Sequence, residues 1–167
     1  MTTTSPTSAT WYLAYGSNMS WDRLRQRIDV HVLCHSRDGA LTAVLRGWRL
    51  CFDKAAGDGS GYAGLIANDG SAPDAEGVLW PVSPAGLQVL DSFEGVPRHY
   101  CREMWQVVCS DGATRSAAVY IQQAAVSEAG LLPRRDYLNH ILAGIDLLSP
   151  AYGDWLRSLP VCGQEVC

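Results

Sequence analysis

The sequence predicts an α+β fold in which a β-sheet curls into a barrel and helices pack outside it. Short apolar runs alternate with Gly-, Asp- and Ser-rich turns through residues 11–122. After residue 123 the pattern changes to helical periodicity, with no internal repeat and no dividing linker. The 167 residues suit one domain with an adequate core. We expect residues 11–167 to form that domain, after a disordered tail at residues 1–10.

The predicted strands are apolar or alternating runs that end at turn compositions. They lie at residues 11–15, 30–34, 39–52, 62–67, 76–82, 100–109 and 113–122. The last two are separated by Ser110-Asp111-Gly112, a spacing typical of a β-hairpin. The Gly- and Asp-rich residues 53–61 are expected to form a loop.

The predicted helices begin at residues suited to capping. Ser20 is placed to cap a short helix at 21–26, and Ser83 with Pro84 begins a helix that Gly95 ends. Pro133 precedes an amphipathic helix at 134–145. Ser149-Pro150 begins the last helix.

Composition excludes several classes of function. Apolar residues make up 47% of the chain and charged residues 18%, as in a globular protein, and the net charge of −4 does not favour nucleic acid or an acidic membrane surface. No apolar run reaches the roughly 18 residues of a membrane-spanning helix. The first ten residues contain no Lys or Arg and no apolar core, unlike a signal peptide. We therefore expect a cytoplasmic protein.

The six cysteines form no CxxC motif, and four of them lie in strand-like runs. In a cytoplasmic protein they are expected to be reduced and mostly buried. The exception is a pair near the C-terminus that can cross-link on oxidation. The cysteines are Cys34, Cys51, Cys101 and Cys109, and the C-terminal pair Cys162 and Cys167.

Glu94 is the strongest candidate for a catalytic group. Leu87, Leu90 and Glu94 have i, i+3, i+7 spacing on one helix face, and two of the three are apolar. An inward position and the C-terminal end of a helix both raise the pKa of a carboxylate. Such a carboxylate suits proton transfer near neutral pH. The alternative is a frayed last turn with Glu94 in solvent.

Tyr15-Gly16-Ser17-Asn18 connects a strand to the start of a helix. Gly16 allows the backbone to approach a ligand closely, and successive amides at such a turn can bind a small anion such as a carboxylate. The alternative is an ordinary strand-to-helix turn.

Other kinds of site are poorly supported. His31 and His35 fall in a predicted strand, where their spacing separates them by ~13 Å, and His99 and His140 have no adjacent Cys or carboxylate cluster. Ser17 lacks the G-x-S-x-G context and an evident base. The chain has neither a G-x-G-x-x-G fingerprint nor a phosphate-binding loop with its Lys. We therefore expect no metal and no cofactor.

Three segments together resemble the γ-glutamylcyclotransferase-like (AIG2-like) family. The first is Tyr15–Asn18, which matches a YGSN signature, and the second is Leu90–Val96 followed by Tyr100, which matches LDxxEGV…Y. The third resembles the late Y…PSxxYLxxIxxG region of the family. Its residues here are Tyr120, Pro133, Tyr137, Leu138, Ile141 and Gly144.

The resemblance implies a small mixed β-barrel with flanking helices and a small-molecule γ-glutamyl substrate. It implies that the loop from Tyr15 through Gly16 and Ser17 to Asn18 holds the α-carboxylate of that substrate. Glu94 would be the general acid and base, needing no cofactor. The tyrosines implied to line the pocket are Tyr100, Tyr120 and Tyr137. The expected reaction releases 5-oxoproline from a γ-glutamyl amine or γ-glutamyl amino acid.

The sequence departs from the family pattern in ways that bear on the leaving group. Met19 replaces a Leu, Arg134-Arg135 stands where Ser-x is common, and His99 precedes Tyr100. The identity of the leaving amine or amino acid therefore stays open. Two further functions fit the same fold: a non-catalytic module that binds a small carboxylate or a protein, and an amidohydrolase.

Overall fold

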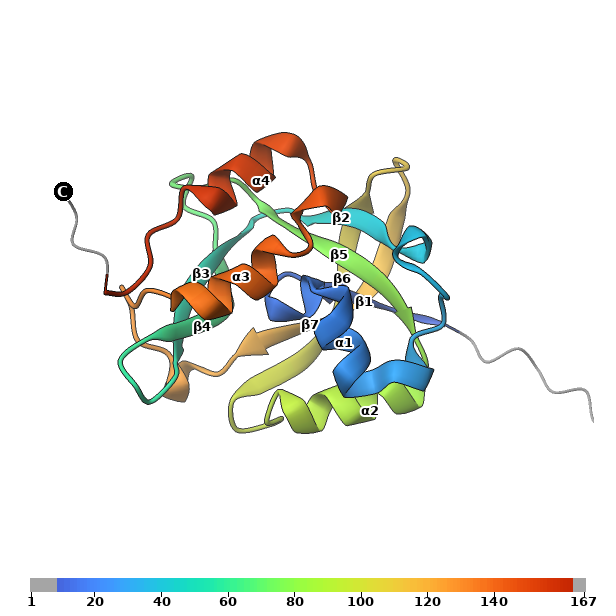
Figure 1. Cartoon of the computed structure of the whole chain (residues 1–167), viewed down its shortest axis with the longest axis horizontal. Helices are drawn as coiled ribbons and strands as arrows, with labels where there is room; N and C mark the ends of the chain where they lie inside the picture. The colour runs from blue at the N-terminus through green and yellow to red at the C-terminus, as the bar shows by residue number, and fades with distance from the viewer. Residues whose placement is uncertain (1–8, 164–167) are drawn as a thin grey trace, which may run out of the picture.

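A closed five-stranded barrel forms the body of the computed structural model, which describes residues 9–163 (Figure 1). The strand order is β1-β5-β2-β6-β7. β1 pairs with β7 in parallel, and all other neighbouring pairs are antiparallel, which confirms the predicted mixed barrel. The barrel strands are β1 (Thr10–Ala14), β2 (Leu41–Leu45), β5 (Ala75–Val82), β6 (Tyr100–Cys109) and β7 (Thr114–Gln122).

Two further strands, β3 (Trp48–Ala55) and β4 (Gly61–Ala67), form a separate antiparallel sheet. Their pairing is irregular, because Cys51 pairs with Gly64 while Lys54 pairs with Tyr62. The register shift is a β-bulge that leaves Ala63 without a partner in the ladder. Ala63 lies in the wall of the candidate site.

Within residues 9–163, four α-helices flank the barrel: α1 (Trp21–Ile28), α2 (Pro84–Phe93), α3 (Arg135–Leu142) and α4 (Pro150–Arg157). The three predicted serine caps form, with Ser20, Ser83 and Ser149 each accepting a hydrogen bond from a main-chain NH of the first turn. α1 and α2 lie beside each other in Figure 1. Each helix in this part of the chain is too short or too polar to span a lipid bilayer.

The predicted strand at residues 30–34 is wrong. The chain instead forms a 3-10 turn, η2 (Asp29–His31), and only Val32 makes an isolated bridge, to Val82. The prediction assumed that the apolar residues of this run are buried. Val30 is instead 81% exposed and does not pack in the core. The spacing inferred for His31 and His35 assumed that strand and therefore does not apply.

The predicted strand at 39–52 is two strands. Gly47, with a φ of +81°, makes the turn between β2 and β3, and Gly39 belongs to a 3-10 turn, η3 (Arg37–Gly39). The predicted loop at 53–61 is too long, since β3 continues to Ala55 and β4 begins at Gly61. Lys54 is consequently a strand residue rather than a loop residue.

The helix predicted at 134–145 ends at Leu142. Gly144 packs against the main chain of Met19, where an added Cβ would lie 2.6 Å from the carbonyl oxygen. The chain must turn there, and Ile145 starts a separate 3-10 turn, η5 (Ile145–Leu147). This close approach fixes α3 against η1 (Ser17–Met19), the turn that carries the YGSN signature.

Two predictions concern the ends of the chain: the tail at residues 1–10 and the cross-link between Cys162 and Cys167. β1 begins at Thr10, so Thr10 belongs to the barrel and not to the predicted tail, while residues 1–8 lie outside the described residues. Cys167 also lies outside them, and its expected cross-link to Cys162 stays a prediction. Among the described cysteines, Cys51 and Cys109 are buried, and all five, including the exposed Cys162, are free.

Candidate active site

A cavity of about 490 Å³ opens between the barrel, α1, the end of α2 and the β3–β4 sheet. Segments far apart in the sequence meet there, including η1, the residues after α2 and the start of α3. Every site residue predicted from the sequence lines this cavity. They are Tyr15, Gly16, Ser17, Asn18, Glu94, Tyr100, Tyr120 and Tyr137.

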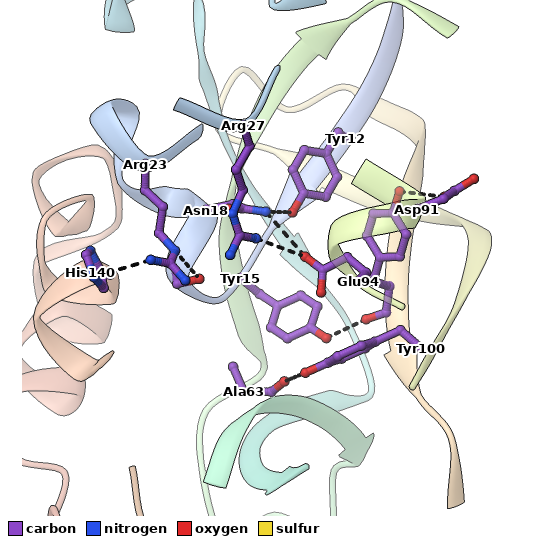
Figure 2. Close-up of polar contacts among 12 residues, drawn as sticks. Tyr12, Tyr15, Asn18, Arg23, Arg27, Ala63, Asp91, Glu94, Tyr100 and His140 are labelled. Atoms are coloured by element: carbon purple, nitrogen blue, oxygen red, sulfur yellow. Dashed lines mark hydrogen bonds and ion pairs between the residues drawn. The ribbon is translucent and has the colours of Figure 1, made fainter. Parts of the chain in front are cut away.

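Glu94 follows the last residue of α2 and faces the cavity rather than solvent. Its main-chain NH donates to the Leu90 carbonyl oxygen over 2.8 Å, so the final turn is not frayed. The side chain is only 18% exposed. Figure 2 shows its carboxylate directed towards Asn18 and Arg27, with Oε1 at 3.4 Å from Asn18 Nδ2 and 3.7 Å from Arg27 Nη1.

The electrostatics of Glu94 combine burial with three nearby cations. Burial raises the pKa of Glu94 above its ordinary value of 4.5, because a carboxylate loses hydration in the cavity wall. Arg27, Arg23 and Lys54 oppose that increase, and burial has the larger effect. The result is an acid whose ionised and protonated forms are closer in free energy than in water, as proton transfer requires.

The YGSN loop forms the 3-10 turn η1. Met19 NH donates to the Gly16 carbonyl oxygen and Ser20 NH to that of Ser17. Within residues 9–163, the main-chain NH groups of Ser17 and Asn18 donate to no other segment. Gly16 is needed because a Cβ there would lie 3.0 Å from the Ala63 Cβ. The turn therefore offers unused donors to a small anion.

Asn18 connects this loop to Glu94. Its Nδ2 donates to the Tyr12 hydroxyl over 3.0 Å and lies near the Glu94 carboxylate. Trp80 Nε1 donates to the Asn18 carbonyl oxygen over 3.1 Å, which anchors the loop to the barrel. The Asn18 Oδ1 atom is buried and has no hydrogen-bond partner among the described residues. A buried acceptor of this kind is available to a donor on a ligand.

Hydrogen bonds of three tyrosine hydroxyl groups connect the segments that form the cavity walls. Ala63, left unpaired by the bulge in β3, donates its NH to the Tyr137 hydroxyl over 3.1 Å and accepts from the Tyr100 hydroxyl over 2.7 Å. The Tyr15 hydroxyl donates to the Tyr120 carbonyl oxygen. Burial raises the pKa of Tyr137 to about 12, so its hydroxyl stays protonated at neutral pH.

Sequence reasoning missed the cations of the site. Arg23 and Arg27 lie one turn apart on α1, where charged residues are usually interpreted as a solvated face. Arg23 Nε donates to Ser17 Oγ over 3.0 Å, and its Nη1 lies 3.5 Å from His140 Nε2 (Figure 2). The sequence feature that could have identified Arg23 and Arg27 is their i, i+4 spacing directly after the YGSN loop.

Lys54 and Tyr12 were also missed. Lys54 continues the inward alternation of Leu50 and Phe52 along β3, a signal that the expected loop at 53–61 obscured. Tyr12 was interpreted only as part of a buried strand. No group of three or more His, Cys, Asp or Glu residues suitable for a metal ion occurs in the part of the chain that the structure describes.

The model of a protein family described as gamma-glutamyl cyclotransferase, AIG2-like, matches residues 12–139. The chain belongs to this family. The matched residues include the YGSN loop, Glu94 and the three predicted pocket tyrosines, Tyr100, Tyr120 and Tyr137. Every residue that lines the cavity therefore lies within the matched range. No curated protein sequence matches the chain significantly.

Solved structures share the fold of this gamma-glutamyl cyclotransferase-like chain at low sequence identity. An uncharacterized human protein, loc79017, is 23% identical with a TM-score of 0.78, covering 96% of this chain and 93% of its own. A structure titled gamma-glutamyl cyclotransferase is 23% identical with a TM-score of 0.78, covering 95% and 92%. YkqA from Bacillus subtilis is 24% identical with a TM-score of 0.76, covering 92% and 56%. At these identities the likeness concerns the fold alone.

Proposed function

We propose that this chain is a cyclotransferase that releases 5-oxoproline from a γ-glutamyl amide, with Glu94 as general acid and base. One observation carries the proposal. Among the described residues, Glu94 is the only carboxylate that lines the cavity, and burial raises its pKa. A cyclisation whose nucleophile belongs to the substrate needs one such group and no protein nucleophile.

In the proposed reaction the α-nitrogen of the γ-glutamyl group attacks its own δ-carbonyl carbon. A C–N bond forms to close the five-membered ring, and the C–N bond to the leaving nitrogen breaks. Glu94 accepts a proton from the attacking α-nitrogen and returns it to the leaving nitrogen. Water is neither consumed nor produced. General acid–base catalysis of this kind typically contributes ~10²–10⁴ in rate.

The remaining part of the barrier is lowered by holding the substrate bent. Alignment of an intramolecular nucleophile can be worth up to roughly 7–11 kcal/mol in model systems. In our proposal the α-carboxylate of the substrate binds the free NH groups of Ser17 and Asn18, with Arg23 adjacent. The unpaired Asn18 Oδ1 then accepts from the α-amine and keeps it near Glu94. These contacts place the amine for attack.

Product analysis in H₂¹⁸O tests the proposal. The wild-type protein is incubated with γ-glutamyl-alanine, with heat-denatured protein as the blank for spontaneous cyclisation, and the products are measured by mass spectrometry. Equal amounts of alanine and unlabelled 5-oxoproline are expected, because no water enters the reaction. Glutamate that contains ¹⁸O would show an amidohydrolase. Recovery of γ-glutamyl-alanine and of a γ-glutamyl amine, both unchanged, would show a binding module. Either result contradicts the cyclotransferase.

A further inference from the structure

Lys54 is a buried residue of the cavity wall, and its ammonium group has no anionic partner among the described residues. The residue is only 8% exposed. Its Nζ donates to the neighbouring Ala55 carbonyl oxygen over 3.1 Å and lies 5.5 Å from the centre of the Tyr62 ring. None of the ion pairs formed by the described residues includes Lys54. A buried, unpaired charge is costly to folding, so its presence calls for a ligand.

The backbone builds this position specifically. Two residues of β3, Phe52 and Asp53, stand opposite Ala63 alone, and this bulge precedes Lys54. Gly61 permits it, because a Cβ there would lie 1.7 Å from the Phe52 carbonyl oxygen. β-Bulges re-aim side chains and are frequent beside active sites. Lys54 lines the cavity directly after this local departure from regular pairing.

The cations of the cavity wall come from two elements, and all of them lower the pKa of Glu94. Arg23 and Arg27 come from α1, whereas Lys54 comes from β3. Glu94 in turn raises the pKa of Lys54. Because the arginines and Lys54 lie on different elements of the cavity wall, they offer negative charge two binding positions. One carboxylate facing three cations leaves the cavity net positive, which favours a ligand with more than one anionic group.

We propose that Lys54 binds a carboxylate on the leaving half of the substrate and so selects the leaving group. This inference rests on the proposed cyclotransferase function. A γ-glutamyl amino acid has one carboxylate on each side of the scissile amide. The glutamyl carboxylate binds at η1 and Arg23, the scissile amide lies at Glu94, and the second carboxylate pairs with the Lys54 ammonium. A γ-glutamyl amine lacks that second carboxylate and leaves Lys54 unpaired.

Two substrates that differ only in this carboxylate test the proposal. They are γ-glutamyl-alanine and γ-glutamyl-alaninamide, compared by kcat/KM for 5-oxoproline release. A charged hydrogen bond supports an expected preference for γ-glutamyl-alanine of about 10- to 100-fold. Lys54→Met removes this preference, because kcat/KM for γ-glutamyl-alanine falls further than kcat/KM for the amide. The altered pKa of Glu94 affects both substrates equally and cancels in their ratio. Lys54→Arg restores at least part of the preference.

Controls separate binding from folding. Arg46→Met removes one positive charge from the exposed β2–β3 turn, away from the cavity, and leaves the preference unchanged. Lys54→Met keeps the length of the apolar stem and removes a buried charge, so thermal unfolding shows no loss of stability. Lys54→Gln provides a second uncharged variant if the methionine variant does not fold.

Calorimetry distinguishes failure of this inference from failure of the proposed function. Both ligands are titrated into Glu94→Gln and into Glu94→Gln/Lys54→Met. Weaker binding of γ-glutamyl-alanine alone in the double variant supports the Lys54 site even if no protein releases 5-oxoproline. Equal binding of the two ligands by Glu94→Gln, or equal weakening of both by the second substitution, overturns it.

Discussion

Helix α2 carries two carboxylates, at Asp91 and just past its end at Glu94, and their surroundings differ. Asp91 accepts a hydrogen bond from the Tyr120 hydroxyl over 2.8 Å and lies 3.4 Å from Arg102. Glu94 has only longer contacts, at 3.4 Å and 3.7 Å. In Figure 2, Asp91 lies apart from the Glu94 carboxylate and makes a different hydrogen bond. Glu94 lines the cavity and Asp91 does not.

The comparison shows that helix position decides what an acid can do. Positions three residues apart differ by about 60° around a helix, enough to move a side chain from one cluster to another. Asp91 is engaged by a short hydrogen bond that joins α2 to β7. Glu94 stands where Gly95, with a φ of +62°, ends the helix, and its carboxylate stays available to a ligand. The first acid is structural, and the second is proposed to be catalytic.

The largest expected contrast is in activity. Glu94→Gln preserves the shape of the side chain but cannot accept a proton, so kcat/KM for 5-oxoproline release should fall by ~10²–10⁴. The matched change Asp91→Asn should reduce it by less than about tenfold. Steady-state assays with γ-glutamyl-alanine measure both. A larger loss in Asp91→Asn than in Glu94→Gln would reverse the assigned roles.

Stability should show the opposite contrast. Asp91→Ala removes an acceptor from the buried Tyr120 hydroxyl, which keeps only the Leu87 carbonyl oxygen at 3.2 Å, and should lower the free energy of unfolding by about 1–2 kcal/mol. Glu94→Gln should not lower the free energy of unfolding at pH 7, because it removes a partly buried charge. Urea denaturation measures both variants. A destabilised Glu94→Gln would make Glu94 a structural residue.

The pH dependence of the free energy of unfolding tests whether the charge on Glu94 destabilises the folded protein. The pKa of Glu94 is raised in the folded protein, so ionisation of Glu94 disfavours folding. Its contribution to stability is fully present below the unfolded value near 4.5 and is lost as the pH rises through the higher folded pKa. Relative to wild type, Glu94→Gln should therefore gain stability between pH 4 and pH 7. A constant difference over this range would contradict a raised pKa.

A smaller effect should come from the cation beside Glu94. Arg27 lowers the pKa of Glu94, so Arg27→Met should move the acidic limb of the kcat–pH profile upward. Arg25→Met is the matched control, because Arg25 pairs with Asp29 on the exposed side of the same helix. A shift in the control, or a downward shift in Arg27→Met, would remove Arg27 as the tuning cation.

Local signals predicted the parts of the site that short motifs define. The inward face of α2 and the turn at Gly95 placed Glu94 correctly, and the hairpin of β6 and β7 was recognised from its turn. Arg27 and Lys54 were missed because their roles depend on which distant elements face them. The strand at 30–34 was wrong because this run makes only one isolated bridge to the end of β5, between Val32 and Val82. Tertiary pairing, which one sequence does not display, decided these cases.

The most direct test of the central claim is a single-turnover measurement on Glu94→Gln. The variant is saturated with γ-glutamyl-alanine, and the bound compound is recovered and identified over time. Because the binding contacts at η1 remain, the account predicts affinity within about threefold of wild type and recovery of intact γ-glutamyl-alanine. Recovery of 5-oxoproline at the wild-type rate would contradict proton transfer by Glu94.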